Sequence, residues 1–442
     1  MIFADWLEDH DDLPRAELIR LQCRHAQLPY RDYQSVQLRA QIHQVIEENK
    51  KRWRGRIPKG LSLAFRLGLF KVTLPSNALN REKVIDWWTT YQPWIEKAIF
   101  SGTGDVKIKD LIRSNRLHLL STLAIRHPLN IRGSIKTLNK LDDLQKLEIN
   151  LDRSTTDREL KDLESLHQIQ ALDLCRERHV PESGVSRVPR LPNLRQLKVR
   201  LDLQSEGVEG FRSLPNLRNV TLGLYELDKS DRLDALGELQ DLNRIYFYYG
   251  VDPAKEVGKL ARAANLREFR ITHILLSEAT VQAVSRLRQV ETLRLCPTER
   301  VGRDWMSNLK SLTKLSDLDL SECEYKSQGH FKHLTSLEHL ETLNLDNSNV
   351  TATALRTLTS IPSLKRLYLR NASLSSKQYK PLASMPNLES LDLTSSTVDD
   401  EALHYVEEMP SLKWVNLNGA RTSRRAIRQL RKARKDVIVE SS

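Results

Sequence analysis

A six-residue pattern, L-x-x-L-x-L, recurs along the chain at nearly constant spacing, and this period restricts the folds that the chain can adopt. Thirteen copies follow one another at intervals of 23 to 25 residues. In every copy the residues three and five positions after the first are also apolar, so all 39 such positions are apolar in a chain that is 40% hydrophobic. We call the first residue of each copy its anchor. The anchors are Leu120, Leu144, Ile169, Leu194, Leu217, Leu242, Leu266, Val290, Leu315, Leu340, Leu364, Leu388 and Leu412.

The part of each copy that follows this pattern is equally regular. In the copy Leu340–Ser363, apolar residues at helical spacing precede Pro362, whose missing N–H ends a helix. These apolar residues are Val350, Leu355, Leu358 and Ile361. Each copy therefore predicts a short strand followed by an amphipathic helix, and the array of copies predicts an α/β fold.

The period and the strand pattern resemble those of leucine-rich repeats, and the resemblance extends from about residue 95 to residue 440. It implies a solenoid in which a curved parallel sheet carries helices on its convex side. Physical reasoning agrees, because a strand with three apolar residues on one face cannot bury them alone and neighbouring copies must stack. One column departs from the family pattern: Asn349, Ser373 and Thr397 share a position that is often asparagine. The sequence therefore does not decide whether the usual asparagine ladder is present.

The two ends of a solenoid expose its core and need caps. At the C-terminus, residues 424–435 predict a basic helix and Val437–Val439 a last strand. Before the repeats, residues 14–28 and 33–53 predict helices, and Leu69, Val72 and Leu74 predict a first, atypical strand. We expect a helical module at 1–68, the solenoid at 69–420 and a C-terminal cap at 421–442.

The first part of the chain carries a second resemblance. The segments Phe3–Glu8 and Pro14–Gln22 resemble the repeat-companion domain that precedes repeats in planctomycete-type bacterial proteins, and Trp53 and the run Phe65–Leu69 match later landmarks of that family. The resemblance implies a small helical module with no established chemistry. That family usually has another helix before its first motif, so either this helix is missing or the native start lies upstream of Met1.

The motif residues Asp5, Trp6, Arg15 and Glu17 have two interpretations. They could form a docking surface, or they could be architectural, with Trp6 packed and Arg15 paired to Glu17 on the helix surface. We favour the architectural interpretation, because motif residues in small helical modules usually support the fold. We therefore expect the module to cap the solenoid.

Positive charge gathers in two segments. The chain has 69 basic and 57 acidic residues, a net charge of +12. Residues 50–59 contain six basic residues and no acid, and residues 421–442 contain eight basic and two acidic residues, so these segments account for the whole excess. The rest of the chain is close to neutral, which argues against a protein that coats a polyanion. Binding of nucleic acid or another polyanion through 50–59 and 421–435, with Trp53 as a stacking surface, remains the alternative function.

The sequence predicts no enzyme, cofactor or small-molecule substrate, because it contains none of the phosphate-binding, zinc-protease or nucleophile-elbow motifs. Four widely spaced cysteines without a CxxC pair, and the lack of a leader or spanning segment, predict a cytoplasmic protein. Cys175 and Cys296 follow strands, and we interpret them as small unpaired residues. His330, His333 and His339 form the closest histidine cluster, but no complete ligand set accompanies them, so we expect no metal.

The candidate binding residues are those that point out of the sheet. Residues two, four and six positions after each anchor alternate away from the core and form the concave face. Across the array these positions change from basic and aromatic to acidic, and then to basic and aromatic again. The candidate residues are Lys198, Arg200, Arg244, Tyr246, Tyr248, Arg270, Arg294, Asp317, Asp319, Arg366, Tyr368, Arg370 and Trp414.

Two interpretations apply to this face as well. Strands of any solenoid need β-forming residues on their open side, and tyrosine and arginine can fill that role while solvated. Arginine and aromatic residues also dominate the energetics of interfaces, and segregated charge orients a partner. We favour binding of a protein partner, with Arg244, Tyr246, Tyr248, Arg270 and Arg294 at the centre. The sequence does not identify the partner, the pathway or the oligomeric state.

Overall fold

A computed structural model of the chain describes residues 2–28, 34–75, 78, 81–101, 112, 117–125, 135–149, 161–174, 189–202, 208–225, 234–248, 252–274, 276–296, 301, 304–325 and 328–441. The chain divides into two compact units, Met1–Leu217 and Arg218–Ser442. We describe each unit by itself. Among the described residues, no helix combines the length and the apolar composition that crossing a bilayer requires.

The first unit begins with three helices, α1 (Ile2–Asp9), α2 (Leu13–Gln27) and α3 (Gln34–Arg54). Helices α1 and α2 share a small core of Ala4, Leu7, Ala16 and Ile19. Pro14 lies in the first turn of α2, where its missing N–H costs no hydrogen bond. The predicted helices at 14–28 and 33–53 are confirmed as α2 and α3. Helix α1 was not predicted, because eight residues are too few for a clear helical period.

A hairpin follows these helices. Strands β1 (Ser62–Arg66) and β2 (Leu69–Pro75) pair antiparallel, and Leu67 and Gly68 between them both have positive φ, at 49° and 75°. A Cβ at Gly68 would lie 2.8 Å from Ile19 Cγ1, so glycine serves both the turn and the close approach to α2. Strand β2 confirms the predicted first strand. The module boundary that we expect after residue 68 lies within this turn.

The rest of the first unit is a parallel sheet in which each strand from β2 to β7 pairs with the next. Its further strands are β3 (Ile95–Ser101), β4 (Thr122–Ile125), β5 (Lys146–Ile149), β6 (Ala171–Leu174) and β7 (Gln196–Asp202). Its described helical segments, with 3₁₀ helices labelled η, are α4 (Glu82–Tyr91), η2 (Gln92–Trp94), η3 (Ile135–Lys140) and η4 (Val208–Ser213).

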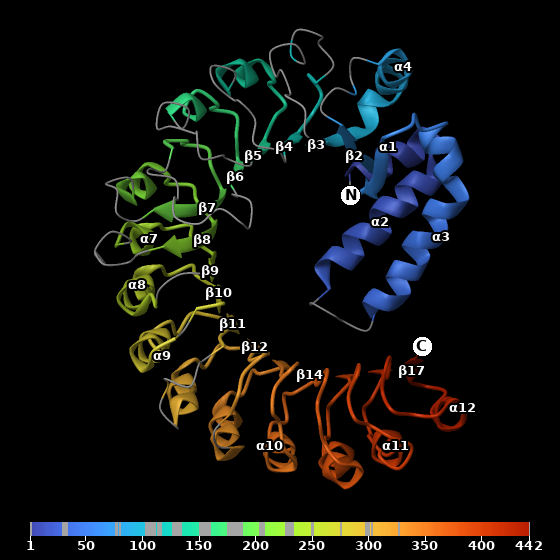
Figure 1. Cartoon of the computed structure of the whole chain (residues 1–442), viewed down its shortest axis with the longest axis vertical. Coiled ribbons are helices and arrows are strands. Elements are labelled where there is room, and N and C mark those ends of the chain that lie inside the picture. The colour runs from blue at the N-terminus through green and yellow to red at the C-terminus, as the bar shows by residue number, and fades with distance from the viewer. Residues whose placement is uncertain are drawn as a thin grey trace. The chain divides into compact units, whose positions relative to one another are not determined.

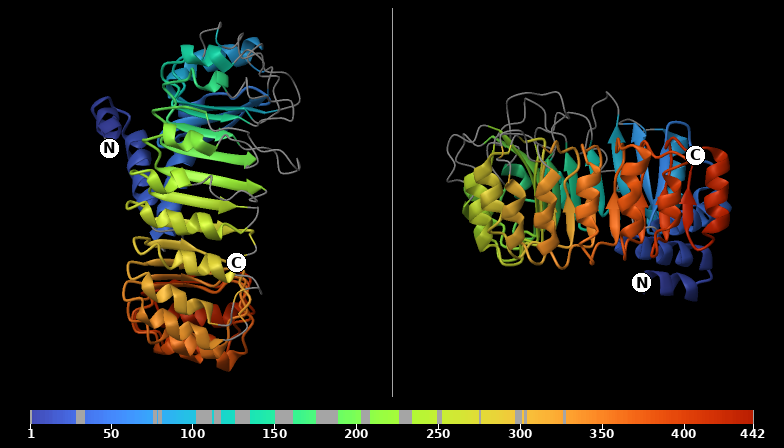
Figure 2. Two further views of the ribbon diagram at one scale, coloured as in Figure 1. Left: turned by 90° about the vertical axis from the view of Figure 1, so that its left-hand side faces the viewer. Right: turned by 90° about the horizontal axis from the view of Figure 1, so that it is seen from below.

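The second unit is also a parallel sheet, formed by β8 (Asn219–Tyr225), β9 (Arg244–Tyr248), β10 (Glu268–Thr272), β11 (Thr292–Arg294), β12 (Asp317–Asp319), β13 (Thr342–Asn344), β14 (Arg366–Tyr368), β15 (Ser390–Asp392), β16 (Trp414–Asn416) and β17 (Ile438–Glu440). Within this unit the sheet curves, and the helical segments cover its convex side (Figure 1). Figure 2 shows the same two layers from other directions.

The helical segments of the second unit are α7 (Asp234–Glu238), α8 (Ala254–Lys259), η6 (Leu260–Arg262), α9 (Glu278–Val284), η7 (Trp305–Ser311), η8 (Gln328–Ser336), α10 (Ala352–Leu358), η9 (Ser376–Ser384), α11 (Leu403–Glu407) and α12 (Arg424–Ala433). The helical segments η7, η8 and η9 are 3₁₀ helices and not α-helices. In η9 the cause is visible, because Pro381 lies inside the segment and lacks the N–H that an α-helical bond needs.

The predicted core is confirmed. All 39 apolar positions of the repeated pattern are at most 3% exposed. In the parallel register Leu318, Leu343, Leu367 and Leu391 lie opposite one another on successive strands, so each copy covers its neighbours. The fold is therefore the leucine-rich-repeat solenoid that the sequence predicts, with the helices α1, α2 and α3 before it.

A column of polar side chains joins successive copies. The residue before the anchor donates from its side chain to a main-chain carbonyl of the corresponding turn one repeat earlier, as Asn387 Nδ2 does to the Pro362 carbonyl at 2.8 Å. These polar residues are Gln168, Asn193, Asn216, Asn265, Gln289, Ser363, Asn387 and Ser411. The sequence shows an amide or hydroxyl residue before each of these anchors, but its partner, a carbonyl one repeat earlier, becomes evident only in the structure.

The turn after each strand is built alike in neighbouring copies. Four residues four positions after an anchor accept the N–H two residues later at 3.0 Å, and they are Asp319, Asn344, Asp392 and Asn416. Seven positions after the anchor the backbone is left-handed, with φ between 56° and 71° at His273, Glu322, Asn347, Asn371, Ser395 and Gly419. In the column of the expected asparagine ladder, Asn349 accepts from Tyr325 N at 2.7 Å, and Thr397 accepts from Leu374 N at 2.8 Å. Threonine therefore replaces asparagine without loss of the bond to the earlier repeat.

The predicted C-terminal helix and strand are confirmed as α12 and β17. Strand β17 pairs with β16 and continues the parallel sheet. Arg434, just after α12, donates to the main-chain carbonyls of Glu407 and Met409, both at 2.8 Å, and to that of Leu412 at 3.2 Å. One side chain therefore attaches this last segment to the repeat before it.

Truncation of a core leucine should destabilise the whole stack. Leu343 is fully buried, so we expect Leu343→Ala to lower the free energy of unfolding by about 2–5 kcal/mol through the cavity that it leaves. Denaturant titration of the full chain measures this loss. The exposed control Glu338→Ala should change stability by less than about 0.5 kcal/mol. An equal, small effect of both substitutions would contradict the stacked core.

Loss of Arg434 should loosen the C-terminal segment. We expect Arg434→Ala to cost about 1–3 kcal/mol, because it leaves the carbonyls of Glu407, Met409 and Leu412 without their charged donor. Lys432 is an exposed basic residue of α12, and Lys432→Ala is the matched control. Hydrogen exchange of the amides in β17 should become faster in the first variant and stay unchanged in the second. Equal exchange in both variants would show that Arg434 does not hold this segment.

Candidate partner-binding surface

The centre of the candidate surface lies on strands β9 and β10 of the second unit. Glu268 lies between two arginines and pairs with both: Arg244 Nε is 3.1 Å from Glu268 Oε2, and Arg270 Nε is 2.6 Å from Glu268 Oε1. The side chain of Arg244 is 61% exposed, whereas that of Glu268 is 20% exposed. The carboxylate therefore forms ion pairs with two guanidinium groups while leaving much of Arg244 open to a partner.

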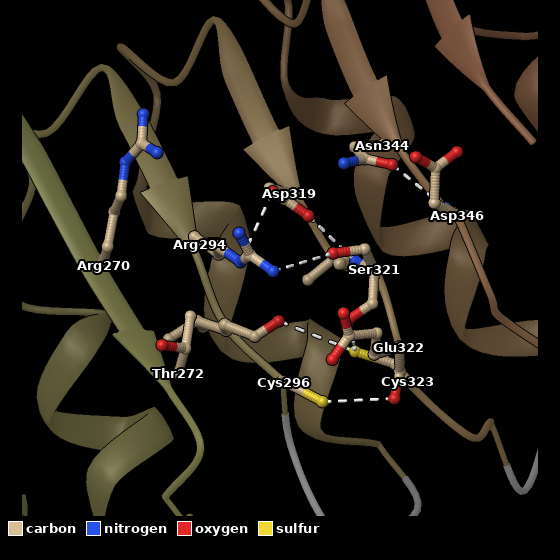
Figure 3. A network of polar contacts seen from close by, with 12 residues as sticks. Arg270, Thr272, Arg294, Cys296, Asp319, Ser321, Glu322, Cys323, Asn344 and Asp346 are labelled. Atoms are coloured by element: carbon tan, nitrogen blue, oxygen red, sulfur yellow. Dashed lines mark hydrogen bonds and ion pairs between the residues drawn. The ribbon is translucent and has the colours of Figure 1, made fainter. Parts of the chain in front are cut away.

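The neighbouring strands continue this pattern (Figure 3). Arg294 lies 3.5 Å from the Asp319 carboxylate through Nε, and its Nη2 donates to Ser321 Oγ at 3.3 Å. Asp319 also accepts the N–H of Ser321 at 3.0 Å. Asp319 thus has a structural role in the turn as well as a charge on the concave face.

Asp317 is the most perturbed carboxyl group of this surface. Burial is the main cause that raises its pKa to about 6, and the nearby charge of Asp319 adds to the effect. Arg270 and Arg366 act in the opposite direction, because their positive charges favour the carboxylate. Carboxyl groups whose pKa is raised by burial are often found at functional sites.

The aromatic and basic candidates differ in accessibility. Tyr246 is partly exposed, and its hydroxyl lies 2.6 Å from Thr272 Oγ1, which fixes the ring. Arg366 donates to Thr342 Oγ1 at 2.8 Å and to Glu341 Oε2 at 3.1 Å. Arg370 is partly exposed. The side chains of Tyr246 and Arg366 are therefore held in place by hydrogen bonds.

Three aromatic candidates lie at outward positions but are buried, contrary to the exposure that the alternation predicts. Tyr248 is 8% exposed, Tyr368 1% and Trp414 4%. In the parallel register Tyr248 lies between Gly223 and Thr272, and Trp414 lies next to Ser390. We attribute the burial of Tyr248 and Trp414 to these short neighbours, which leave room for the larger side chains.

The first unit contributes little to this surface. Lys198 is partly exposed, and its Nζ lies 3.3 Å from Asp173 Oδ2. The side chain of Arg200 lies outside the described residues. Cys175, which we interpreted as an unpaired residue, also lies outside them. The described candidates therefore gather on the second unit.

Two details of the architectural interpretation of the N-terminal motif are wrong. Trp6 is about half exposed and stacks on His10 with ring centroids 4.0 Å apart, so it is not packed in the core. Arg15 does not pair with Glu17; it is buried, with its guanidinium 3.6 Å from the centroid of Trp94. Burial lowers the pKa of Arg15 to about 10. Arg15 therefore packs α2 against η2, which contains Trp94.

The basic segments are partly structural. Trp53 is buried and cannot stack on a base, so the prediction of Trp53 as a stacking surface for a polyanion is wrong. Lys50 pairs with Glu47, and Arg434 binds main-chain carbonyls. The basic residues of α12 that remain exposed are Arg424, Arg425, Arg428, Arg431 and Lys432.

The histidine cluster has a carboxylate that the sequence did not indicate. Asp304 Oδ1 lies 2.6 Å from His333 Nε2 and 3.3 Å from His330 Nδ1. The hydrogen bond with His333 is the main cause that lowers the pKa of Asp304. Among the residues that the structure describes, no group of three or more histidine, cysteine or acidic side chains is arranged to hold a metal ion.

One family model and several solved structures are similar to this chain. Residues 338–398 match the family model described as "Leucine rich repeat". An internalin (inlF) from Listeria monocytogenes is 16% identical with a TM-score of 0.45, over 78% of this chain and 86% of that one. A leucine-rich-repeat protein from Leptospira interrogans is 16% identical with a TM-score of 0.44, over 79% and 90% of the two chains.

A third similar structure, TLR13 in complex with ssRNA13, is 17% identical with a TM-score of 0.48, over 80% of this chain and 54% of that one. All three structures are distant, so the family match and the repeat itself carry the assignment. The stacked copies bury their apolar positions along the described sheet, and one stretch of them matches the family model. The described residues therefore form a leucine-rich-repeat fold, and residues 338–398 are similar in sequence to that family.

Proposed function

We propose that this protein is a non-enzymatic module that binds a protein partner on the concave face of its second unit. Arg244, Tyr246, Arg270 and Arg294 are its central contacts. The fold supports a binding role, because a stacked sheet holds side chains at fixed spacing and little conformational entropy is lost on association. We further propose the cytoplasm as its compartment, a repeat-companion identity for the N-terminal helices, and the division 1–68, 69–420 and 421–442.

The arrangement of Arg244, Glu268 and Arg270 carries this proposal. Each arginine is already oriented by the carboxylate between them, at 3.1 Å and 2.6 Å, yet Arg244 remains mostly exposed. Arginine is enriched among the residues that dominate protein interfaces, and preorganisation reduces the cost of binding. A surface that needed only solubility would not require arginines fixed in this way.

The surface around this centre carries charges of both signs. Arg366 and Arg370 add positive charge, and Asp317 and Asp319 add negative charge between the two basic groups. A partner with adjacent acidic and basic patches complements this pattern. Tyr248, Tyr368 and Trp414 are too buried to be main contacts, and Lys198 is a peripheral contact.

The alternative function is binding of nucleic acid or another polyanion through 50–59 and 421–435. The exposed arginines of α12 favour it, and the burial of Trp53 argues against it. Salt separates the two functions. Binding through several phosphate contacts should weaken by orders of magnitude as salt rises, whereas a concave interface with oriented side chains should be far less sensitive.

Substitutions on the concave face should weaken partner binding. We expect Tyr246→Ala and Arg270→Ala each to reduce affinity by about tenfold or more without loss of folding. A photo-cross-linking residue at position 246 identifies the partner in native lysate, and calorimetry with the purified partner measures the affinities. Lys310 is exposed on the helical side of the same unit, and Lys310→Ala is the matched control. Unchanged affinity in both concave-face variants would place the binding surface elsewhere.

The buried carboxyl group of Asp317 should make stability depend on pH. Its pKa is raised to about 6 in the folded chain, so the folded state binds the proton more tightly than the unfolded state. Ionisation of Asp317 therefore reduces stability as pH rises from about 4 to about 7. We expect Asp317→Asn to raise the free energy of unfolding by about 1–3 kcal/mol at about pH 7.5.

This gain should disappear at about pH 4, where Asp317 is protonated in the original chain. Denaturant titration at the two pH values measures the difference. The exposed carboxylate Glu338 gives the control Glu338→Gln, which should have little effect at either pH. A loss of stability in Asp317→Asn at both pH values would show that the ionised group stabilises the fold.

A further inference from the structure

Two thiols from neighbouring repeats lie side by side at the edge of the concave face (Figure 3). Cys296 follows β11 and Cys323 follows β12, and these strands pair in parallel. Cys296 is partly exposed, whereas Cys323 is 1% exposed. Both thiols are free in the structure. One accessible thiol therefore lies next to one that is covered.

Reciprocal contacts hold the two thiols together. Cys296 Sγ donates to the carbonyl of Glu322, the residue before Cys323, at 3.2 Å. Cys323 Sγ lies 3.6 Å from the carbonyl of Leu295, the residue before Cys296, and donates to it. Each sulfur thus contacts the peptide bond that leads to the other cysteine. The two side chains therefore lie next to each other across adjacent turns.

The surroundings give the two thiols different reactivity. Contact with the Cys323 side chain is the main cause that lowers the pKa of Cys296, and the positive charge of Arg294 acts in the same direction. Contact with Cys296 and burial raise the pKa of Cys323 well above its usual value. Glu322 and Asp319 oppose the ionisation of Cys296 through their negative charges. Thiolate character therefore favours the accessible sulfur, as oxidation requires.

We propose that Cys296 and Cys323 form a site of reversible oxidation, at which a peroxide converts the pair into a disulfide between adjacent repeats. Cys296 is the sulfur that reacts first and Cys323 is the sulfur that resolves the intermediate. The assignment of these roles follows from access, because peroxide can reach Cys296 from solvent and Cys323 only through it.

The chemistry balances in two steps. The Cys296 thiolate attacks one oxygen of hydrogen peroxide, the O–O bond breaks, and hydroxide leaves, which takes a proton and forms water; Cys296 becomes a sulfenic acid. Cys323 sulfur then attacks the sulfenic sulfur, the S–O bond breaks, and the Cys323 proton leaves with the hydroxyl group as a second water. Two thiols are oxidised, one peroxide is reduced, and an external dithiol reverses the reaction by exchange.

The disulfide would act on the surface next to it. The turn before Cys323 contains Ser321, which accepts a hydrogen bond from Arg294 and donates its N–H to Asp319. Glu322 in the same turn has left-handed backbone, with φ at 64°. A bond that draws Cys323 toward Cys296 must move this turn, and with it the support of Arg294. This effect on binding depends on the proposed function, whereas the oxidation itself does not.

Peptide mapping of the full-length protein tests the site. After brief treatment with dilute hydrogen peroxide and blocking of remaining thiols, mass spectrometry should find a peptide pair that links Cys296 to Cys323 with the loss of two hydrogens. Dithiothreitol should separate this pair. Recovery of Cys296 as a sulfenic acid or a higher oxide, without the linked pair, would overturn the proposal, as would a link from either cysteine to Cys23 or Cys175.

Variants assign the two roles and control for folding. In Cys323→Ser the sulfenic acid at Cys296 should persist and react with dimedone, whereas Cys296→Ser should leave Cys323 unmodified. Cys23→Ser is the matched control, and it should form the linked pair like the original chain. Peptide mapping of the unaltered protein remains decisive if a variant fails to fold. If the linked pair forms but partner affinity is unchanged, the oxidation site is supported and only its effect on the binding surface is contradicted.

Discussion

Contact between successive copies of one strand pattern sustains this structure. Each copy contributes three apolar side chains to the core, and a single strand cannot remove them from water. Only the copies on either side can cover them, which is why all 39 residues are buried while the strands themselves are as short as three residues. The polar features, such as the turns after the strands and the side chains that bind earlier carbonyls, refine a stack that apolar contact has already established.

Much of this fold could be predicted from the sequence because the same pattern of apolar positions recurs in every copy. The register of Leu343 with Leu318 and Leu367 follows directly from the spacing. The convex segments are less predictable, because a few residues between strands can form an α-helix or a 3₁₀ helix. Local choices such as Pro381 decide between them in η9.

The candidate surface was harder to predict, since it depends on neighbours about one repeat apart in the chain. Alternation along a strand places Trp414 and Tyr368 on the concave face, but their burial depends on the size of residues on adjacent strands. The same reason explains Cys296 and Cys323, whose proximity leaves no local motif in the sequence. Charges at Arg244 and Arg270 could be located, whereas their shared carboxylate, Glu268, gains its meaning only in the sheet.

The side chains before the anchors give the array a direction. Each copy supplies the donor, and the acceptor is a main-chain carbonyl that any preceding turn possesses, whatever its side chains. A duplicated repeat would therefore carry its own donor side chain, and the copy before it would need no new residue to accept the bond. Arrays of this design can change length during evolution by internal duplication, and their variable outer columns can then diverge without weakening the joints.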